Sequence, residues 1–385
     1  MNVTGRLYVY EIRKIIHRKI VWIAGAVMVL LCVFLSVSDL VSSVYDGEIS
    51  GYERMKIVRQ YARNLSGRRI DDTLLKEMQD SYREGAAEGE VRAYLPIYMF
   101  VQDITGADEV SQEIDSEGLY LMRQDSISQN RADQMLTEKE RQYWSEKDSK
   151  IETPFTYEYG DGWSNLWEYA YTINYMLLLM ITISLSNVFS MEHFGKTDAI
   201  ILCSQYGKKQ LYLAKILAGI TFGAVTAIIL FGVSAVSSIA IYGADGFHTA
   251  LQIAFPMSSW TMSIGGAVLV LLFILILVSV LYSIVIMFLS EALKNSVAVM
   301  AIPVGIMILT MLVDIPYQFR LVSQIYDLLP TNLLTAWELW DDRLVSVFGK
   351  YLTNFQIAPI IYCVTAALLF FVGKRIYERY QIGAR

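Results

Sequence analysis

The sequence predicts an all-α integral membrane protein with six transmembrane helices, a cytoplasmic N-terminus and C-terminus, and a large helical extracellular domain between helices 1 and 2. Of its 385 residues, 54% are hydrophobic and 18% are charged, whereas about 25% of residues in an average soluble protein are charged. The apolar residues gather in blocks of membrane-spanning length. A long polar stretch separates the first two blocks and predicts the extracellular domain.

Six apolar blocks predict the spans, and none carries a charged residue at its centre: 20–37, 170–189, 211–242, 264–289, 297–313 and 357–372. The basic front of the first block resembles that of a cleaved signal peptide. That front is 19 residues long, which favours a retained anchor over residues 20–41. Residues 1–19 mix basic and apolar side chains at helical spacing, so we expect a cytoplasmic amphipathic helix. The alternative is that they extend the first span.

Lys and Arg residues predict the orientation, because they gather on the cytoplasmic side of membrane proteins. They cluster before the first span, after the second and after the sixth, whereas the loop 243–263 has none. Residues 169–385 are expected to hold helices 2–6, with a cytoplasmic segment at 190–210. Short extracellular helices are expected at 314–356, where Pro316 and Pro330 interrupt the apolar pattern. They would be re-entrant-like, packed against protein rather than lipid.

Residues 42–168 form the predicted extracellular domain. They contain 15 Lys/Arg and 26 Asp/Glu, so their net charge is −11, against +5 for the rest of the chain. Leu74, Leu75, Met78 and Tyr82 recur at helical spacing, which predicts a helical fold. The region has no Cys, so it is expected to be held together by packing rather than by disulfides.

Aromatic residues crowd the end of this domain, where the chain returns to the membrane: Phe155, Tyr157, Tyr159, Trp163, Trp167, Tyr169, Tyr171 and Tyr175. Such crowding is typical of the aromatic belt at a membrane interface. The alternative is a mouth that contacts substrate. The pattern favours the belt, because belts are general in membrane proteins.

Signs of catalysis are absent from the sequence. Gly195-Lys196-Thr197 matches the end of a phosphate-binding loop, but Ser190 replaces its first glycine and an apolar block replaces its strand. His17, His193 and His248 lie on different segments without metal-binding spacing. We therefore expect no catalytic residue, no metal, no cofactor and no nucleic-acid partner on this chain.

The span interiors carry polar but uncharged side chains. Ion-coupled carriers keep ionisable residues near the membrane midplane. The predicted spans have no such residues at their centres, which indicates that a separate subunit supplies the energy for transport. Gly219 and Gly223 form a GxxxG motif, for which packing within one subunit is favoured over a dimer seam. Candidate residues for lining a transport pathway are Asn174, Ser184, Asn187, Ser279 and Ser283.

The segment "MEHFGKTDAIILCSQYGKKQLYLAK" at 191–215 resembles the coupling helix of the type-2 ABC exporter permeases. The residues that match are Glu192, Gly195, Thr197, Asp198, Leu202, Lys208 and Lys215. Lys196 between Gly and Thr, and residues 203–205 where a proline is common, depart from the pattern. The resemblance implies that the segment contacts an ATPase, with Lys196, Tyr206 and Lys209 adding to the contact.

The resemblance also implies the wider function. The chain would be a multi-pass permease subunit in a bacterial plasma membrane, forming a homodimer or heterodimer with a second permease. An ABC ATPase subunit at the cytoplasmic face would bind ATP and Mg²⁺. The substrate would be amphiphilic: a lipid-like molecule, a drug or a peptide. The alternatives are a membrane sensor or immunity protein that binds a ligand through its extracellular domain, and a secondary carrier.

Overall fold

The computed structural model describes residues 3–42, 50–83, 91, 94–106, 114–195 and 197–379. Within these ranges, five helices are long and apolar enough to cross a membrane, which indicates a multi-pass membrane protein. They are α2 (Lys19–Ser42), α9 (Asp161–Leu185), α12 (Lys209–Tyr242), α13 (Ile264–Leu293) and α16 (Asn354–Arg379). The predicted fifth block forms a shorter apolar helix of 17 residues, α14 (Ser296–Leu312), which contains Pro303.

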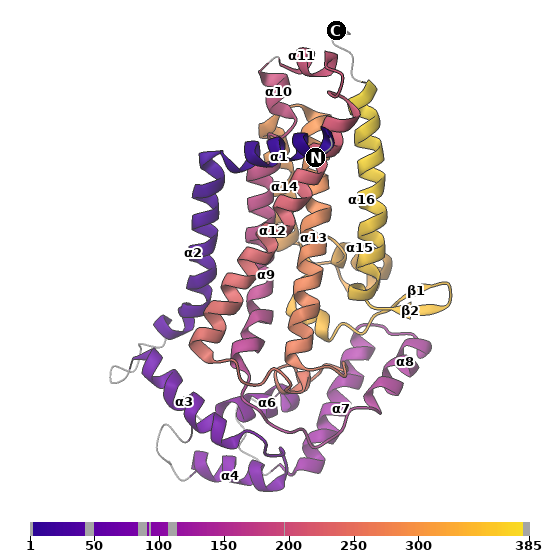
Figure 1. Cartoon of the computed structure of the whole chain (residues 1–385). Coiled ribbons are helices and arrows are strands. Elements are labelled where there is room, and N and C mark those ends of the chain that lie inside the picture. Colours follow the sequence, from indigo (N-terminus) through magenta and orange to yellow (C-terminus); the bar gives the residue numbers. More distant parts are fainter. Residues whose placement is uncertain are drawn as a thin grey trace.

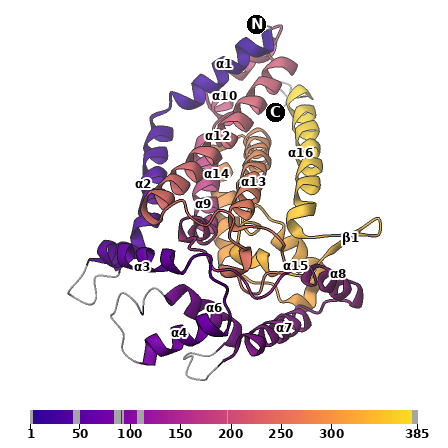
Figure 2. The ribbon, with the colours of Figure 1, turned by 60° about the horizontal axis from the view of Figure 1, so that its bottom comes forward.

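The long helices run side by side, with different structures at their two ends (Figure 1). One end, called the α1 end, carries α1 (Val3–Ile16), α10 (Ser190–Phe194), α11 (Asp198–Cys203) and the last turn of α16. The opposite end carries the helices of residues 50–148, here called the module, and is called the module end. Figure 2, tilted so that the bottom of the molecule comes forward, shows the module spread beneath the bundle from α2 to α16.

The N-terminal segment forms a helix separate from the first span, as the amphipathic pattern predicts. Figure 1 shows α1 lying across the bundle at a steep angle to α2. The indole Nε1 of Trp22 donates a hydrogen bond of 2.8 Å to the carbonyl of Ile16, which caps a free carbonyl where α1 ends. Arg18 donates to the carbonyl of Ser184 at 2.7 Å. The bend between α1 and α2 is therefore fixed to α9.

The GxxxG motif brings α12 close to α13 of the same chain. A Cβ atom at Gly219 would lie 2.3 Å from the Sδ atom of Met287. At Gly223 it would lie 2.2 Å from the Oγ atom of Ser283. Only glycine allows this approach, so the motif packs two helices within one subunit, as the sequence favours.

We expect Gly223→Val to destabilise the protein by about 1–3 kcal/mol, because the added atoms force α12 and α13 apart. Thermal unfolding in detergent measures the loss. Gly232→Val on the same helix is the matched control, since nothing lies within 4 Å of a Cβ placed there. Equal effects of the two substitutions would contradict the close packing.

The described part of 42–168 is helical, as predicted. The helices of the module are α3 (Gly51–Leu65), α4 (Asp72–Arg83), α6 (Leu95–Thr105), α7 (Ser116–Asp133) and α8 (Glu138–Asp148). Leu74, Leu75 and Met78 are buried in its core, whereas Tyr82 is exposed and stacks on Tyr98.

The prediction of a lipid-facing aromatic belt is wrong for most of the rings at the end of the module. Six of them are buried inside the protein: Phe155, Tyr157, Tyr159, Trp167, Tyr169 and Tyr175. The reason is that this stretch passes between the module and the bundle. The amide of Tyr157 donates to the carbonyl of Arg68 in the module, at 2.8 Å. The helix α9 begins farther along this stretch, at Asp161.

Residues 314–356 contain short helices, as expected, but also two strands, which the all-α prediction did not include. The helices are η3 (Tyr317–Phe319), α15 (Arg320–Asp327) and η4 (Ala336–Leu339), and a further 3₁₀ turn, η2 (Leu251–Ile253), precedes α13. The strands β1 (Val345–Val347) and β2 (Lys350–Leu352) pair antiparallel. Phe348 and Gly349 join them with φ of 49° and 79°, the two positive angles of a type I′ hairpin turn.

Candidate functional site

The segment between α9 and α12 forms an elbow, residues 186–208, at the α1 end (Figure 1). One hydroxyl on α13 holds its base. Ser290 Oγ donates to the carbonyl of Ser186 at 2.7 Å and accepts from the amides of Phe189 and Ser190, each at 3.2 Å. These contacts satisfy a carbonyl at the end of α9 and two amides at the start of α10, so the elbow is attached to α13.

Two of the predicted site residues meet inside the elbow. Lys215, 0% exposed on α12, donates from Nζ to Glu192 Oε1 at 2.6 Å and to the carbonyl of Val188 at 2.7 Å. Lys14 of α1 donates to the same Glu192 oxygen at 3.0 Å and contacts Glu11 at 3.2 Å. Glu11 also lies 4.0 Å from Lys215. Two cations and two anions thus join α1, the elbow and α12, and a buried charge is tolerated only when paired in this way.

Aromatic rings pack around this charge cluster. The Nζ atom of Lys215 lies 4.7 Å from the ring centroid of Phe189, within the range of a cation–π contact. Tyr377 of α16 packs on Phe189 and donates to the carbonyl of Gly207 at 3.0 Å. A Cβ atom at Gly207 would lie 1.7 Å from the carbonyl oxygen of Ile201, so the turn into α12 requires glycine. The elbow is consequently attached to α16 as well.

Five of the remaining predicted residues lie at the protein surface. Gly195, Thr197, Tyr206, Lys208 and Lys209 are exposed. Thr197 precedes α11 and its hydroxyl donates to the carbonyl of Glu192 at 3.4 Å. Lys196 lies outside the described residues, and so do the side chains of Asp198 and Leu202. The helices preceding Gly195 agree with the rejection of a phosphate-binding loop, which needs a strand there.

Sequence reasoning missed the most exposed apolar side chains of the elbow. Phe194 is 92% exposed and Ile200 is 75% exposed. Phe194 is the last residue of α10, and Ile200 lies within α11. Exposed apolar groups on a rigid projection are typical of a surface that binds another protein. The sequence feature that could have indicated these side chains is an apolar residue on each side of the polar stretch 195–198.

The candidate pathway residues are not brought together on one surface. Asn174, Ser184, Ser279 and Ser283 are buried within the chain, and Asn187 is half-buried. Asn174 donates to the carbonyl of Pro330 at 2.7 Å, and Ser283 donates to the carbonyl of Ser279 at 2.7 Å. In the single chain Asn174 bonds to a loop, and Ser279 and Ser283 bond to carbonyls of their own helix.

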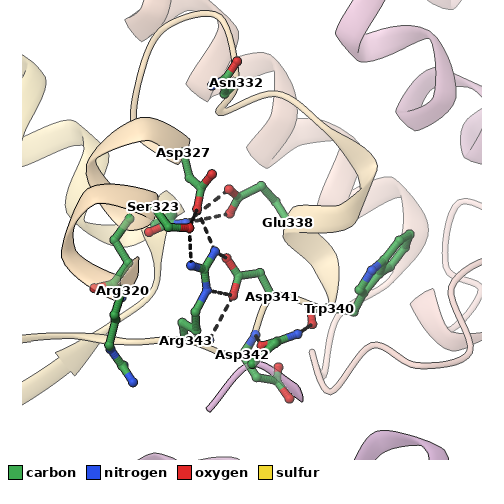
Figure 3. Close-up of polar contacts among 12 residues, drawn as sticks. Arg320, Ser323, Asp327, Asn332, Glu338, Trp340, Asp341, Asp342 and Arg343 are labelled. Carbon is green, nitrogen blue, oxygen red and sulfur yellow. Dashed lines mark hydrogen bonds and ion pairs between the residues drawn. The ribbon is translucent and has the colours of Figure 1, made fainter. Parts of the chain in front are cut away.

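A second polar cluster lies at the module end, and sequence reasoning did not find it. Figure 3 shows the guanidinium of Arg343, 1% exposed, between two carboxylates. It donates to Asp341 at 2.9 and 2.7 Å, to Asp327 at 2.6 Å and to Ser323 at 2.7 Å. A guanidinium bound by several acceptors is the geometry in which buried arginine is stable.

The carboxylates of this cluster outnumber its cation. Glu338 is buried and accepts hydrogen bonds from Asn354 at 3.2 and 3.3 Å. Burial, followed by the charges of Asp341 and Asp327, raises the pKa of Glu338 well above its usual range. Burial raises the pKa of Asp327 to about 6 although Arg343 opposes the shift. Both carboxyl groups therefore hold a proton more tightly than a free acid does.

A neighbouring ion pair connects the cluster to the module. Arg131 of α7 donates to Asp342 at 2.6 Å and to Ser259 at 2.8 Å. Trp144 of α8 donates from Nε1 to the carbonyl of Asp342 at 2.6 Å. Within the described ranges, no group of three or more His, Cys, Asp and Glu side chains is placed to hold a metal ion.

A cavity of about 670 Å³ opens beside Arg343, between α9, the end of α14 and residues 313–343. No family model matches the chain, and no curated protein or solved structure matches it. The chemistry of the elbow and of this cavity is therefore the basis for assigning a function.

Proposed function

We propose that the chain is the permease subunit of an ATP-driven type-2 ABC exporter. The observation that carries the proposal is the elbow, which projects at the α1 end, exposes Phe194 and Ile200, and is joined to the span α12 by the buried Glu192–Lys215 pair. Its sequence is also the segment that resembles the coupling helix of that family. An ATPase subunit, which binds ATP and Mg²⁺, docks on the elbow.

The elbow's contacts explain how a push on it would reach the membrane. Ser290 connects it to α13, Lys215 to α12, Lys14 to α1 and Tyr377 to α16. Because buried ion pairs and packed rings have few alternative arrangements, a displaced elbow moves these helices with it. This chain contributes no hydrolytic step, and its role is to convert movement at the α1 end into rearrangement of the spans.

The proposed orientation places the α1 end in the cytoplasm of a bacterial cell and the module outside. Basic residues of α1 and of the elbow then face the cytoplasm, as Lys and Arg do in membrane proteins. The α14 helix is the fifth of six spans and α16 is the sixth, so that both termini lie inside. A second permease, identical or different, packs against this one. Trp22, Ile23 and Leu30, exposed on α2, face that partner or lipid.

The elbow's exposed side chains provide the first test. We expect Phe194→Glu and Ile200→Glu to abolish co-purification of an ATPase subunit encoded beside this chain, because each places a charge in an apolar contact. Both residues are at the surface, so the thermal stability in detergent should stay unchanged. Leu121→Glu on α7, also an exposed apolar position, is the matched control. Retention of the ATPase by both elbow variants would refute the docking site.

A second candidate function is a membrane sensor or immunity protein. The cavity at the base of the module favours it, since a cavity of this kind can bind a ligand without transport. The two functions differ in one measurable respect. A permease changes the ATP hydrolysis rate of its partner, and that change should disappear in Phe194→Glu. A sensor would retain its ligand and have no ATPase activity associated with it.

A further inference from the structure

The cavity at the module end has the size of a small-molecule site. Its volume of about 670 Å³ lies within the range of roughly 300–1,000 Å³ usual for ligand pockets. Its walls come from three separate parts of the chain: the first turns of α9, the end of α14 and residues 313–343. Sites assembled from several elements in this way are typical of binding cavities.

Six aromatic residues line the cavity: Trp167, Tyr171, Tyr317, Tyr326, Trp337 and Trp340. One of the rings already contacts a cation, because the guanidinium carbon of Arg343 lies 4.3 Å from the ring centroid of Tyr317. Tyr326 is held in place by a hydrogen bond of 2.9 Å from its hydroxyl to the carbonyl of Thr310. Aromatic faces arranged around a cavity attract organic cations.

The charges of the lining favour the same kind of ligand. Glu168, Asp314 and Asp327 line the cavity, and Arg343 is the one basic residue that does so among the described residues. The guanidinium of Arg343 is occupied by Asp341, Asp327 and Ser323, so it has little capacity to bind an anion. The electrostatic potential in the cavity is therefore negative, which raises the local concentration of cations.

One further feature describes the rest of the ligand. Met311 and Leu312, at the end of α14, supply an apolar wall.

We propose that this cavity binds a cationic amphiphile, an ammonium, phosphonium or guanidinium group on an apolar body. The cation lies among the aromatic rings and the carboxylates of Glu168 and Asp314. The apolar body lies against Met311 and Leu312. Binding itself does not depend on transport. The further step, that this ligand is the exported substrate, rests on the proposed permease function.

The test measures binding of tetraphenylphosphonium to the full chain in nanodiscs of neutral lipid, with empty discs as the blank. Equilibrium dialysis gives the affinity, and tryptophan quenching gives a second readout, since three of the chain's seven tryptophans line the cavity. We expect saturable binding of one cation per chain. Tetraphenylborate, of the same shape and opposite charge, should not bind above the blank at a saturable site.

Substitutions that remove carboxylate charges from the cavity lining test whether the cation binds in this cavity. The double variant Glu168→Gln/Asp314→Asn should weaken binding at least about tenfold, because it removes two charges next to the ligand. Both side chains are exposed, so thermal stability should be retained. Asp133→Asn, an exposed acid of the module, is the matched control and should bind like the wild type. Trp337→Leu should weaken binding severalfold by removing one ring.

Three results would overturn the proposal: no saturable tetraphenylphosphonium binding, equal binding of both ions, or the same affinity in the double variant and in Asp133→Asn. The elbow test and this test are independent. The chain is assayed here without an ATPase, so a missing ATPase partner leaves cation binding unchanged. Conversely, loss of cation binding would leave ATPase co-purification intact.

Discussion

Lys215→Met should destabilise the protein by about 3–5 kcal/mol, the usual effect of breaking a buried ion pair. The substitution keeps the length of the side chain but removes the cation 2.6 Å from Glu192. It also leaves the carbonyl of Val188 without its donor. Glu192 and Glu11 then share only Lys14, whose side chain is 35% exposed. Thermal unfolding of the purified protein in detergent measures the loss.

The double variant Glu192→Gln/Lys215→Met should recover most of that stability, because neither charge is left buried alone. Glu192→Gln alone should be as harmful as Lys215→Met. Lys14→Met is the control for the same cluster and should cost at most about 1 kcal/mol, since the ammonium is partly solvated. Strictly additive effects of the two single substitutions would mean that Glu192 and Lys215 do not stabilise each other.

Arg343→Met should destabilise the protein by at least about 3–5 kcal/mol at pH 8 and much less at pH 5. At pH 8 the substitution leaves Asp327, Asp341 and Glu338 buried without their guanidinium. At pH 5 Asp327 and Glu338, whose pKa values burial raises, take up protons, and a neutral acid is tolerated in a buried site. The measurement is the midpoint of thermal unfolding for wild type and variant at both pH values.

The stability of the wild type should also be lower at high pH than at low pH. Burial raises the pKa of Asp327 in the folded protein from 3.8 to about 6, so the folded state binds this proton more tightly than the unfolded chain. The free energy of unfolding therefore falls as the pH rises from about 4 to about 6, and stays low above that range. A shift of this size corresponds to about 3 kcal/mol.

Glu338→Gln is the companion variant for this cluster. Its amide imitates the protonated acid and can still accept a hydrogen bond from Asn354, so it should be as stable as wild type at pH 5 and more stable at pH 8. Combined with Arg343→Met, it should restore part of the stability lost at pH 8. If Arg343→Met loses the same amount of stability at both pH values, the carboxylates around Arg343 do not repel one another.

Hydropathy was sufficient to predict the long helices, because each apolar block has the length that lipid requires. The helix α13 begins at Ile264, where the predicted block also begins. The helix α9 extends well before its block, since Trp167 and Tyr169 are buried by protein and not by lipid. Hydropathy does not distinguish these two environments. The β1–β2 hairpin was missed because Phe348-Gly349 replaces the Asn-Gly or Asp-Gly pair usual in such turns.

The sites were only partly predictable for a related reason. Glu192 and Lys215 were identified from a motif, and the structure pairs them at 2.6 Å. Their enclosure by Lys14 and Glu11 was not predictable, because it depends on where α1 lies. The Arg343 cluster joins Asp327 and Asp341, which are 16 and 2 residues away. Neither spacing matches a known motif. In the sequence, these charged residues therefore look like those of a solvent-exposed loop.

The contacts of α7 and α8 have a consequence for how the protein is made. Arg131 and Trp144 bond to Asp342, which is 211 and 198 residues later, and Arg123 bonds to the carbonyl of Pro256, 133 residues later. A ribosome releases residues in order, so the second half of the module is complete long before its partners exist. Arg131 already has an ion-pair partner within the module, Asp148 at 2.7 Å. Arg123 and Arg131 nevertheless wait for their later partners until the loops before α13 and α16 have been made. Protease sensitivity of α7 and α8 should therefore persist through synthesis and disappear only when nearly the whole chain has been translated.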